Sequence, residues 1–323
     1  MKLETKIKNK KIFITGGAGF IGTTLAKKLV ANNKIVIYDN FHRNALKNTD
    51  LESHPNIKVI SGDVLDSVCL KKNIKGADIV IHMAAIAGID TVIKSPVTTM
   101  KVNMLGTYNI LEASMTLKHL KRFIDFSTSE VFGTYAYKSE EKDSTNLRPV
   151  GEARWVYATS KIAGEHLAHS YHKEFGLPTI AIRPFNVYGP GQVGEGAIHI
   201  FIKKAINNQT IEIHGDGDQI RSWCYIDDMV NAILLCLTKN EAVGEVFNIG
   251  NPKGTVTILS LAEKIKYLAN SKSKIIHIPK GYVDVELRIP SIEKAKTILG
   301  FNPQIDLDEG IKKTIEWYRS NLR

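Results

Sequence analysis

Short apolar segments alternate with amphipathic segments along the first half of the chain. Six apolar segments are expected to form strands buried on both faces, at residues 11–16, 34–39, 57–63, 78–85, 122–127 and 178–186. Helical patterns lie between them, for example at 21–30 and 100–113. Because buried strands joined by helical crossovers pair in parallel, the pattern predicts an α/β fold with a doubly wound parallel sheet.

The pattern changes beyond about residue 185. Glycine and proline are dense at 186–196, which predicts a loop over a ligand. Weaker strand and helix signals follow, up to a helical pattern at 308–318. We therefore expect a first domain at residues 1–184 and a smaller C-terminal substrate-binding domain at 185–323. Some segments near 220–250 are expected to return to the first domain.

A glycine-rich turn, T-G-G-A-G-F-I-G at 15–22, joins the first strand to the first helix. Gly17, Gly19 and Gly22 satisfy G-x-G-x-x-G, and Gly16 extends the pattern. These glycines permit a tight turn and let a pyrophosphate approach the helix N-terminus. Asp39 ends the second strand, where an acidic residue binds the ribose hydroxyls of NAD. The sequence thus predicts a Rossmann-type fold and NAD as cofactor, although His42 and Arg43 leave NADP open.

Tyr157 and Lys161 begin a predicted helix in Y-A-T-S-K, so they lie one turn apart on the same face. A free phenol titrates near ~10 and is a poor base at neutral pH. We expect an adjacent ammonium and a cationic nicotinamide to lower the tyrosine pKa. The pair is then suited to exchange a proton with a sugar hydroxyl during hydride transfer. A lysine stem packed over a core tyrosine is the structural alternative.

Composition narrows the class of protein without naming a reaction. The chain has 323 residues and a net charge of +10, but its basic residues are dispersed, which favours a solvated basic surface over nucleic-acid binding. Three cysteines, Cys69, Cys224 and Cys236, lack metal-ligand spacing and favour a reducing compartment. The first ten residues hold no apolar leader segment, and no apolar stretch is long enough to span a membrane. We expect a cytoplasmic protein with no bound metal, nucleic acid or membrane partner.

Taken together, the motifs resemble those of the extended short-chain dehydrogenase/reductases, in the nucleotide-sugar epimerase/dehydratase group. The resemblance covers nearly the whole chain and rests on T-G-G-A-G-F-I-G (15–22), D-V (63–64), H-M-A-A (82–85), N-x-x-G-T (103–107), S-T-S-E-V-F-G (127–133), Y-A-T-S-K (157–161), R-P-F-N-V-Y-G-P-G (183–191) and R-S-W-C-Y-I-D-D (221–228).

The resemblance implies a set of site residues. The catalytic residues would be Thr128, Ser129, Glu130, Tyr157 and Lys161. The cofactor site would consist of Gly16, Gly19, Phe20, Ile21, Gly22, Asp39, Asn40, Asp63, Val64, Ala84, Ala85, Tyr157 and Lys161. Asn186, Arg221 and Arg288 would bind the nucleotide sugar. Two helices, at about 97–118 and 156–175, resemble the pair that forms a homodimer in this group.

The order Thr-Ser-Glu at 128–130 favours an NAD-dependent 4,6-dehydratase. By the resemblance, Tyr157 takes the proton when C4 of the sugar is oxidised, and Thr128 binds the C4 oxygen. Glu130 then removes the C5 proton, and Ser129 contacts the departing C6 hydroxyl. Departures from the GDP-mannose and dTDP-glucose patterns favour a UDP-hexose such as UDP-N-acetylglucosamine.

Two other reactions of the same group remain open. Ser-Glu also occurs in UDP-glucuronate decarboxylases, and A-R-W-V-Y at 153–157 resembles that branch. A UDP-sugar 4-epimerase or 4-ketoreductase is the third possibility. For Glu130 itself, a carboxylate bonded to the neighbouring backbone is the structural alternative.

Overall fold

A seven-stranded parallel sheet forms the centre of the molecule. The computed structural model describes residues 7–47, 49–279, 281 and 283–321. Residues 1–6, part of the segment expected to contain no leader, lie outside this description. The strand order is β12-β7-β5-β4-β1-β2-β3, with every neighbouring pair parallel. The strands are β1 Lys11–Thr15, β2 Lys34–Asp39, β3 Ile57–Ser61, β4 Ile79–His82, β5 Arg122–Phe126, β7 Thr179–Pro184 and β12 Val246–Ile249.

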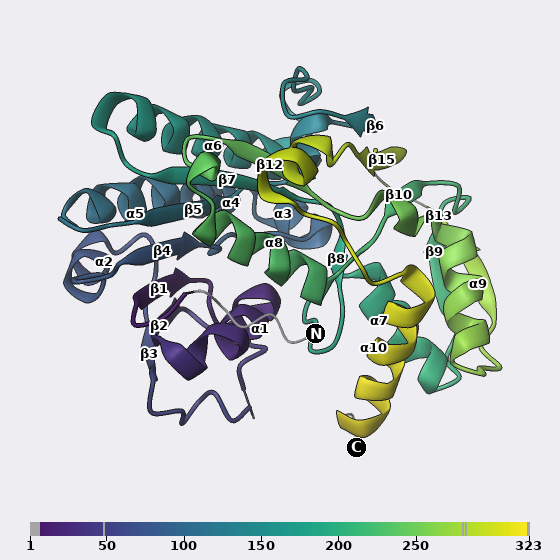
Figure 1. The fold of residues 1–323 in the computed structure, drawn as a ribbon. Helices are drawn as coiled ribbons and strands as arrows, with labels where there is room; N and C mark the ends of the chain where they lie inside the picture. The colour runs from purple at the N-terminus through teal and green to yellow at the C-terminus, as the bar shows by residue number, and fades with distance from the viewer. Residues whose placement is uncertain (1–6, 48, 280, 282, 322–323) are drawn as a thin grey trace.

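Helices cover both faces of the sheet (Figure 1). On one face, α1 (Phe20–Leu29) and α8 (Ile226–Thr238) pack on isoleucines of β1 and β4. On the other face, α2 (Ser67–Asn73), α5 (Gly106–Met115) and α6 (Val156–Phe175) pack on Phe13, Val80 and Phe123. Adjacent residues of one strand thus enter different cores, so the fold is doubly wound as predicted.

All six predicted strands are present: β2 has the predicted bounds, and the other five are shorter than predicted. One prediction is wrong: β3 is an edge strand of the sheet, and Lys58, Val59 and Ser61 on it are exposed rather than buried. The seventh strand, β12, comes from the segment near 220–250 and pairs with β7. Over the described residues, no helix combines the length and apolar character needed to cross a bilayer.

The helix predicted at 100–113 is part of a longer, irregular one. It begins as α4 (Pro96–Met100), continues through a π-helical turn at Lys101–Leu105 and then becomes α5. A short helix, α3 (Ile89–Lys94), precedes it. The π-helical turn contains Asn103, whose side chain bonds Ile86 and Ser160 and so fixes the loop after β4 against α6.

The remaining elements gather beyond the C-terminal ends of the sheet strands. A four-stranded sheet has the order β13-β10-β15-β6. In Figure 1, the helices α7, α9 and the yellow α10 lie together on the side away from α2 and α5. The bounds are β6 Tyr135–Ser139, β8 Val187–Tyr188, β9 Ile211–His214, β10 Ile220–Ser222, β11 Cys224–Tyr225, β13 Thr255–Thr257, β14 Ile275–Ile278, β15 Leu287–Pro290, α7 Ala197–Ile206, α9 Ile258–Leu268 and α10 Leu307–Asn321.

Candidate active site

A cavity of about 720 Å³ opens at the carboxyl ends of the central strands. This is where ligands bind in doubly wound α/β folds. All thirteen residues predicted to bind the cofactor line it, together with Thr128, Ser129 and Glu130. The resemblance therefore selected residues that the fold brings to one place, although they are spread from Gly16 to Lys161 along the chain.

The phosphate loop has the close approach that its glycines predict. Gly16 adopts a positive φ of 69°, and a Cβ there would lie 2.6 Å from the backbone nitrogen of Ala84. A Cβ on Gly22 would lie 2.7 Å from the Cα of Gly17. Larger residues at either position would push the turn away from the sheet. The turn consequently leads directly into the N-terminus of α1, where backbone N–H groups are free to bind a pyrophosphate.

Asp39 is placed to bind a ribose at the end of β2. Its two carboxylate oxygens accept hydrogen bonds from the backbone N–H groups of Ala18 and Phe41, at 3.0 and 2.8 Å. Burial raises the pKa of Asp39, and these N–H donors act against that rise. Each oxygen retains a second lone pair for a ribose hydroxyl. This donor and acceptor set fits the adenosine ribose of NAD.

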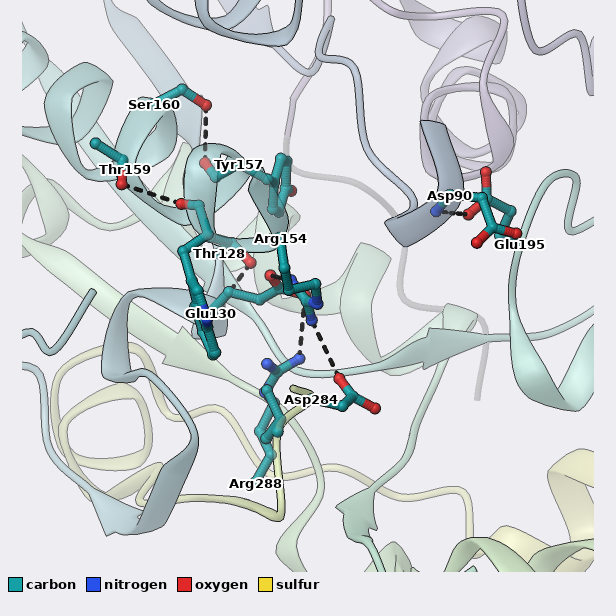
Figure 2. Close-up of polar contacts among 12 residues, drawn as sticks. Asp90, Thr128, Glu130, Arg154, Tyr157, Thr159, Ser160, Glu195, Asp284 and Arg288 are labelled. Atoms are coloured by element: carbon teal, nitrogen blue, oxygen red, sulfur yellow. Dashed lines mark hydrogen bonds and ion pairs between the residues drawn. The ribbon is translucent and has the colours of Figure 1, made fainter. Parts of the chain in front are cut away.

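Arg43, which left NADP open, is engaged elsewhere. Its guanidinium donates to the carbonyl of Ala87 at 2.7 Å and pairs with Glu195 at 3.4 Å. Glu195 also accepts from the backbone N–H of Asp90, as Figure 2 shows, and from the Thr91 hydroxyl. Three loops that line the cavity are thereby tied together. The pairing leaves Arg43 poorly placed for a 2′-phosphate, which agrees with NAD.

Tyr157 and Lys161 lie on the first turns of α6 and both line the cavity. The lowering of the tyrosine pKa was expected with a cationic nicotinamide beside the phenol and stays a prediction. Burial raises the pKa of Tyr157 to about 12, and the negative charge of Glu130 acts in the same direction. The hydroxyl of Thr128 and the guanidinium of Arg288 oppose that rise. In the chain alone the phenol is therefore protonated at neutral pH.

Glu130 is held by arginines and not by neighbouring backbone, so that structural alternative is wrong. Arg154 donates to both carboxylate oxygens, at 2.6 and 3.2 Å, and Arg288 lies 3.5 Å away. Figure 2 shows both guanidinium groups directed at Glu130, with Asp284 beside Arg154 at 3.3 Å. Burial would raise the pKa of Glu130, but the charges of Arg288 and Arg154 hold it below its ordinary value. Glu130 is thus an ionised carboxylate at neutral pH.

The three predicted substrate ligands lie in different surroundings. Asn186 and Arg288 line the cavity. Arg221 is not among its lining residues: it donates to the carbonyl of Val285 at 2.6 Å and pairs with Asp284 at 3.3 Å. Arg221 therefore stands behind the cavity wall in this structure, and its contact with a substrate stays a prediction.

Sequence reasoning left three charged residues of this region out of the predicted site. Arg154 could have been predicted from the sequence, because A-R-W-V-Y places it three residues before Tyr157, on the turn that leads into α6. Glu195 lies in the glycine-rich loop that was predicted to cover a ligand, yet no motif identified its partners. No local sequence pattern identifies Asp284, because its partner Arg154 lies 130 positions earlier in the chain.

Comparison with known proteins agrees with this geometry. Residues 12–250 match the model of the NAD dependent epimerase/dehydratase family. The chain is 35% identical over 320 residues to a UDP-N-acetyl-alpha-D-glucosaminuronate decarboxylase of Bacillus cytotoxicus, covering 96% of this chain and 98% of that protein. It is 37% identical over 269 residues to a dTDP-D-glucose 4,6-dehydratase of Dictyostelium discoideum, covering 79% of this chain and 61% of that protein.

Solved structures extend the comparison to a third reaction. A UDP-glucuronic acid 4-epimerase of Bacillus cereus, in complex with UDP-glucuronic acid and NAD, superposes with a TM-score of 0.86 and 31% identity, covering 96% of this chain and 99% of that one. The chain belongs to the NAD-dependent epimerase/dehydratase family. It is an enzyme of that family and its cofactor is NAD. The predicted resemblance, fold class and cofactor are thereby confirmed.

Proposed function

We propose that the protein is a UDP-hexuronate decarboxylase, which oxidises its substrate at C4, releases the C5 carboxylate as CO₂ and reduces the resulting ketone. This proposal replaces the 4,6-dehydratase favoured from the sequence. The observation that supports it is the pairing of Glu130, which lines the cavity, with the guanidinium groups of Arg154 and Arg288. The decarboxylase of Bacillus cytotoxicus, similar over almost its whole length, supports the same choice.

The protonation state of Glu130 separates the two reactions. A 4,6-dehydratase needs Glu130 to take the C5 proton, and a general base is most effective when its pKa lies near the working pH. The pKa of Glu130 is instead lowered by Arg288 and Arg154, against the effect of burial. A decarboxylase needs no proton abstraction at C5. An ionised, immobilised Glu130 therefore suits decarboxylation better than elimination.

The charges around Glu130 suit an anionic sugar. Arg154, Arg221 and Arg288 face Glu130 and Asp284, which leaves an excess of one positive charge among these five side chains. The Nε and Nη2 atoms of Arg288 are buried and have no hydrogen-bond partner among the described residues. Forked arginine donors match a carboxylate. We propose that Arg288 binds the C5 carboxylate, with Arg154 keeping Glu130 in place beside it.

The proposed reaction needs only a few steps from the residues of the chain. Tyr157 takes the proton of the C4 hydroxyl while Thr128 donates a hydrogen bond to the C4 oxygen. Bound NAD supplies the hydride acceptor for this oxidation and the hydride donor for the later reduction. With a ketone at C4, the bond from C5 to its carboxylate breaks, CO₂ leaves and the electron pair passes toward the C4 oxygen. A proton from solvent then adds to C5, and Tyr157 returns its own proton to the C4 oxygen when the ketone is reduced.

Mass analysis of the product tests the proposal. The purified protein is incubated separately with UDP-N-acetylglucosaminuronate, UDP-glucuronate, UDP-N-acetylglucosamine and dTDP-glucose. Loss of the mass of CO₂ from either hexuronate is the expected result. Loss of the mass of water from a neutral hexose would restore the dehydratase. An unchanged mass with inverted C4 stereochemistry would identify an epimerase, and both outcomes would refute decarboxylation.

A further inference from the structure

The glycine-rich segment at 189–196, all of which the structure describes, lies against the cavity without forming a helix or a strand. Gln192 and Val193 of this segment line the cavity. Three of its glycines adopt positive φ angles, of 155°, 77° and 94°: Gly189, Gly191 and Gly194. Because no regular element fixes this path, the segment depends on contacts with other parts of the chain to keep its place. We call residues 189–196 the strap.

The C-terminal end of the strap is bonded to the loops that follow the predicted NAD ligands on β2 and β4. Glu195 accepts a hydrogen bond from the backbone N–H of Asp90 at 3.1 Å (Figure 2), and it pairs with Arg43 at 3.4 Å. A Cβ on Gly194 would lie 2.9 Å from Cζ of Arg43, and a Cβ on Gly88 would lie 2.7 Å from Cδ of Glu195. Both glycines also have positive φ. The strap therefore comes this close to the cofactor loops because these two positions lack side chains.

The middle of the strap is held by a different element, the C-terminal helix α10. The hydroxyl of Tyr318 donates a hydrogen bond of 2.9 Å to the backbone carbonyl of Gln192, across 126 positions of the chain. Tyr318 is 2% exposed, and its ring packs edge-on against Trp317 with the ring centroids 4.9 Å apart. Tyr318 is not among the residues that line the cavity. It therefore reaches the cavity through the strap.

The direction of the Tyr318 hydroxyl is set by His199 of α7, whose Nδ1 is hydrogen-bonded to it. The hydroxyl has one proton, and the carbonyl of Gln192 can only accept, so Nδ1 of His199 must carry a proton and donate it to the Tyr318 oxygen. Burial and the charge of Lys203 lower the pKa of His199 to about 4. The ring is therefore neutral at neutral pH, with its single proton on Nδ1. His199, Tyr318 and the strap form one chain of hydrogen bonds.

We propose that Tyr318 is a positioning residue that keeps the strap closed over bound NAD. Its hydroxyl fixes the carbonyl of Gln192, and Glu195 fixes the end of the strap beside Arg43, so the residues between stay against the cavity. Retention of NAD matters whenever a hydride taken from the sugar in the first step must return to it. The inference rests on NAD as the cofactor and not on which sugar reaction follows, so it can fail while the proposed function stands.

The rate of NAD release tests this role. NAD-loaded protein is mixed in a stopped-flow instrument with an excess of a fluorescent ethenoadenine analogue of NAD, which replaces NAD as it leaves. Tyr318→Phe keeps the ring and removes one neutral hydrogen bond, so NAD release should be about fivefold faster than in the wild type. A folded Tyr318→Phe protein that releases NAD at the wild-type rate would overturn the proposal.

Thr314→Val is the matched control on the same helix. The hydroxyl of Thr314 is also buried, but it donates to the carbonyl of Gly310 within α10 and makes no contact with the strap. Its replacement removes a buried hydroxyl four residues before Tyr318 and should leave the rate of NAD release unchanged. If both variants accelerated release equally, a loosened α10 would explain the effect, and the role given to the Tyr318 hydroxyl would be wrong.

Two variants of His199 with nearly the same shape separate positioning from a merely structural role. In His199→Asn the side-chain amide can still donate to the Tyr318 oxygen, so NAD release should stay near the wild-type rate. In His199→Asp the carboxylate can only accept. It draws the Tyr318 proton away from Gln192, and release should accelerate about as much as in Tyr318→Phe.

A double variant checks that His199 acts through the hydroxyl. In the Tyr318→Phe background, His199→Asp should cause no further acceleration of NAD release. A full effect in that background would come from the new charge alone and would refute the proposal. Equal release rates for His199→Asn and His199→Asp would also refute it, and this comparison stands even if Tyr318→Phe fails to fold.

Discussion

Replacing Arg154 with methionine tests the electrostatic basis of the proposed function. The variant removes two hydrogen bonds to Glu130, of 2.6 and 3.2 Å, and leaves Arg288 at 3.5 Å as its remaining partner. Arg154 and Glu130 are 6% and 15% exposed, so solvent does little to replace the lost contact. Methionine fills much of the same space, and the change is therefore mainly one of charge.

The expected loss of stability is large for one substitution. Removing one partner of a buried ion pair costs about 3–5 kcal/mol. Because Arg288 still faces Glu130, we expect the lower end, about 3 kcal/mol. At roughly 2 °C per kcal/mol for a protein of this size, the melting temperature should fall by about 6 °C.

The sign of the pH effect follows from the direction of the Glu130 pKa. In the wild type this pKa is lowered, so the ion pair contributes stability above the pKa of the unfolded state and loses it as the pH falls through the folded-state pKa. The stability difference between wild type and Arg154→Met should thus shrink in acid. Because the variant raises the pKa of Glu130, the acid limb of kcat/KM should move to higher pH.

Arg183→Met provides a matched control for this variant. Arg183 and Glu165 form a similarly buried pair, at 2.6 and 3.0 Å, whose residues do not line the cavity. Its loss should lower the melting temperature by a comparable amount without moving the acid limb of kcat/KM. Thermal unfolding measures the change in melting temperature. The pH profile of kcat/KM, recorded with a substrate that the enzyme turns over, measures the position of the acid limb. An unshifted acid limb for a folded Arg154→Met protein would refute the role given to the Arg154–Glu130 pair.

Three further variants test other parts of the site and assembly. Tyr157→Phe should slow C4 oxidation at least about 100-fold while the protein still binds NAD, and wild-type turnover would exclude Tyr157 as the acid–base group. Glu195→Gln weakens a half-exposed contact to Arg43, so stopped-flow displacement should give NAD dissociation faster by about fivefold or less. Slower dissociation would contradict a role for the Arg43–Glu195 contact in keeping NAD bound. Leu105 is 49% exposed on the predicted dimer face; Leu105→Glu should yield monomers by light scattering, whereas a monomeric wild type would contradict that face.

Much of the fold was predictable because its signals are local. Buried strands of parallel sheets are almost continuously apolar, and the loop at 15–22 combines glycine spacing with a strand before it and a helix after it. The edge position of β3 was not predictable in this way. An edge strand is defined by the absence of a neighbour, and the residues of β3 alone do not show which strand ends the sheet.

The sequence predicted those residues of the candidate site that lie within motifs of the family. Thr128, Glu130 and Tyr157 were found because the family pattern names them, and the fold then brings them to one cavity. The partners of Glu130 were not found. Arg288 reaches it from β15 and Arg154 from the turn before α6, and such pairings depend on tertiary packing. The proposal of decarboxylation over elimination rests on those partners, whereas the dehydratase was favoured from the order Thr-Ser-Glu at 128–130 without them.

The buried polar atoms that lack partners suggest where this enzyme sacrifices stability for function. Unpartnered atoms of Asp125 and Ser127 lie at the end of β5, and those of Arg154 and Arg288 lie around Glu130. A core selected for stability alone would pair or remove such groups. Six of the ten such atoms among the described residues belong to these two groups, and the group around Glu130 is suited to receive an anionic sugar.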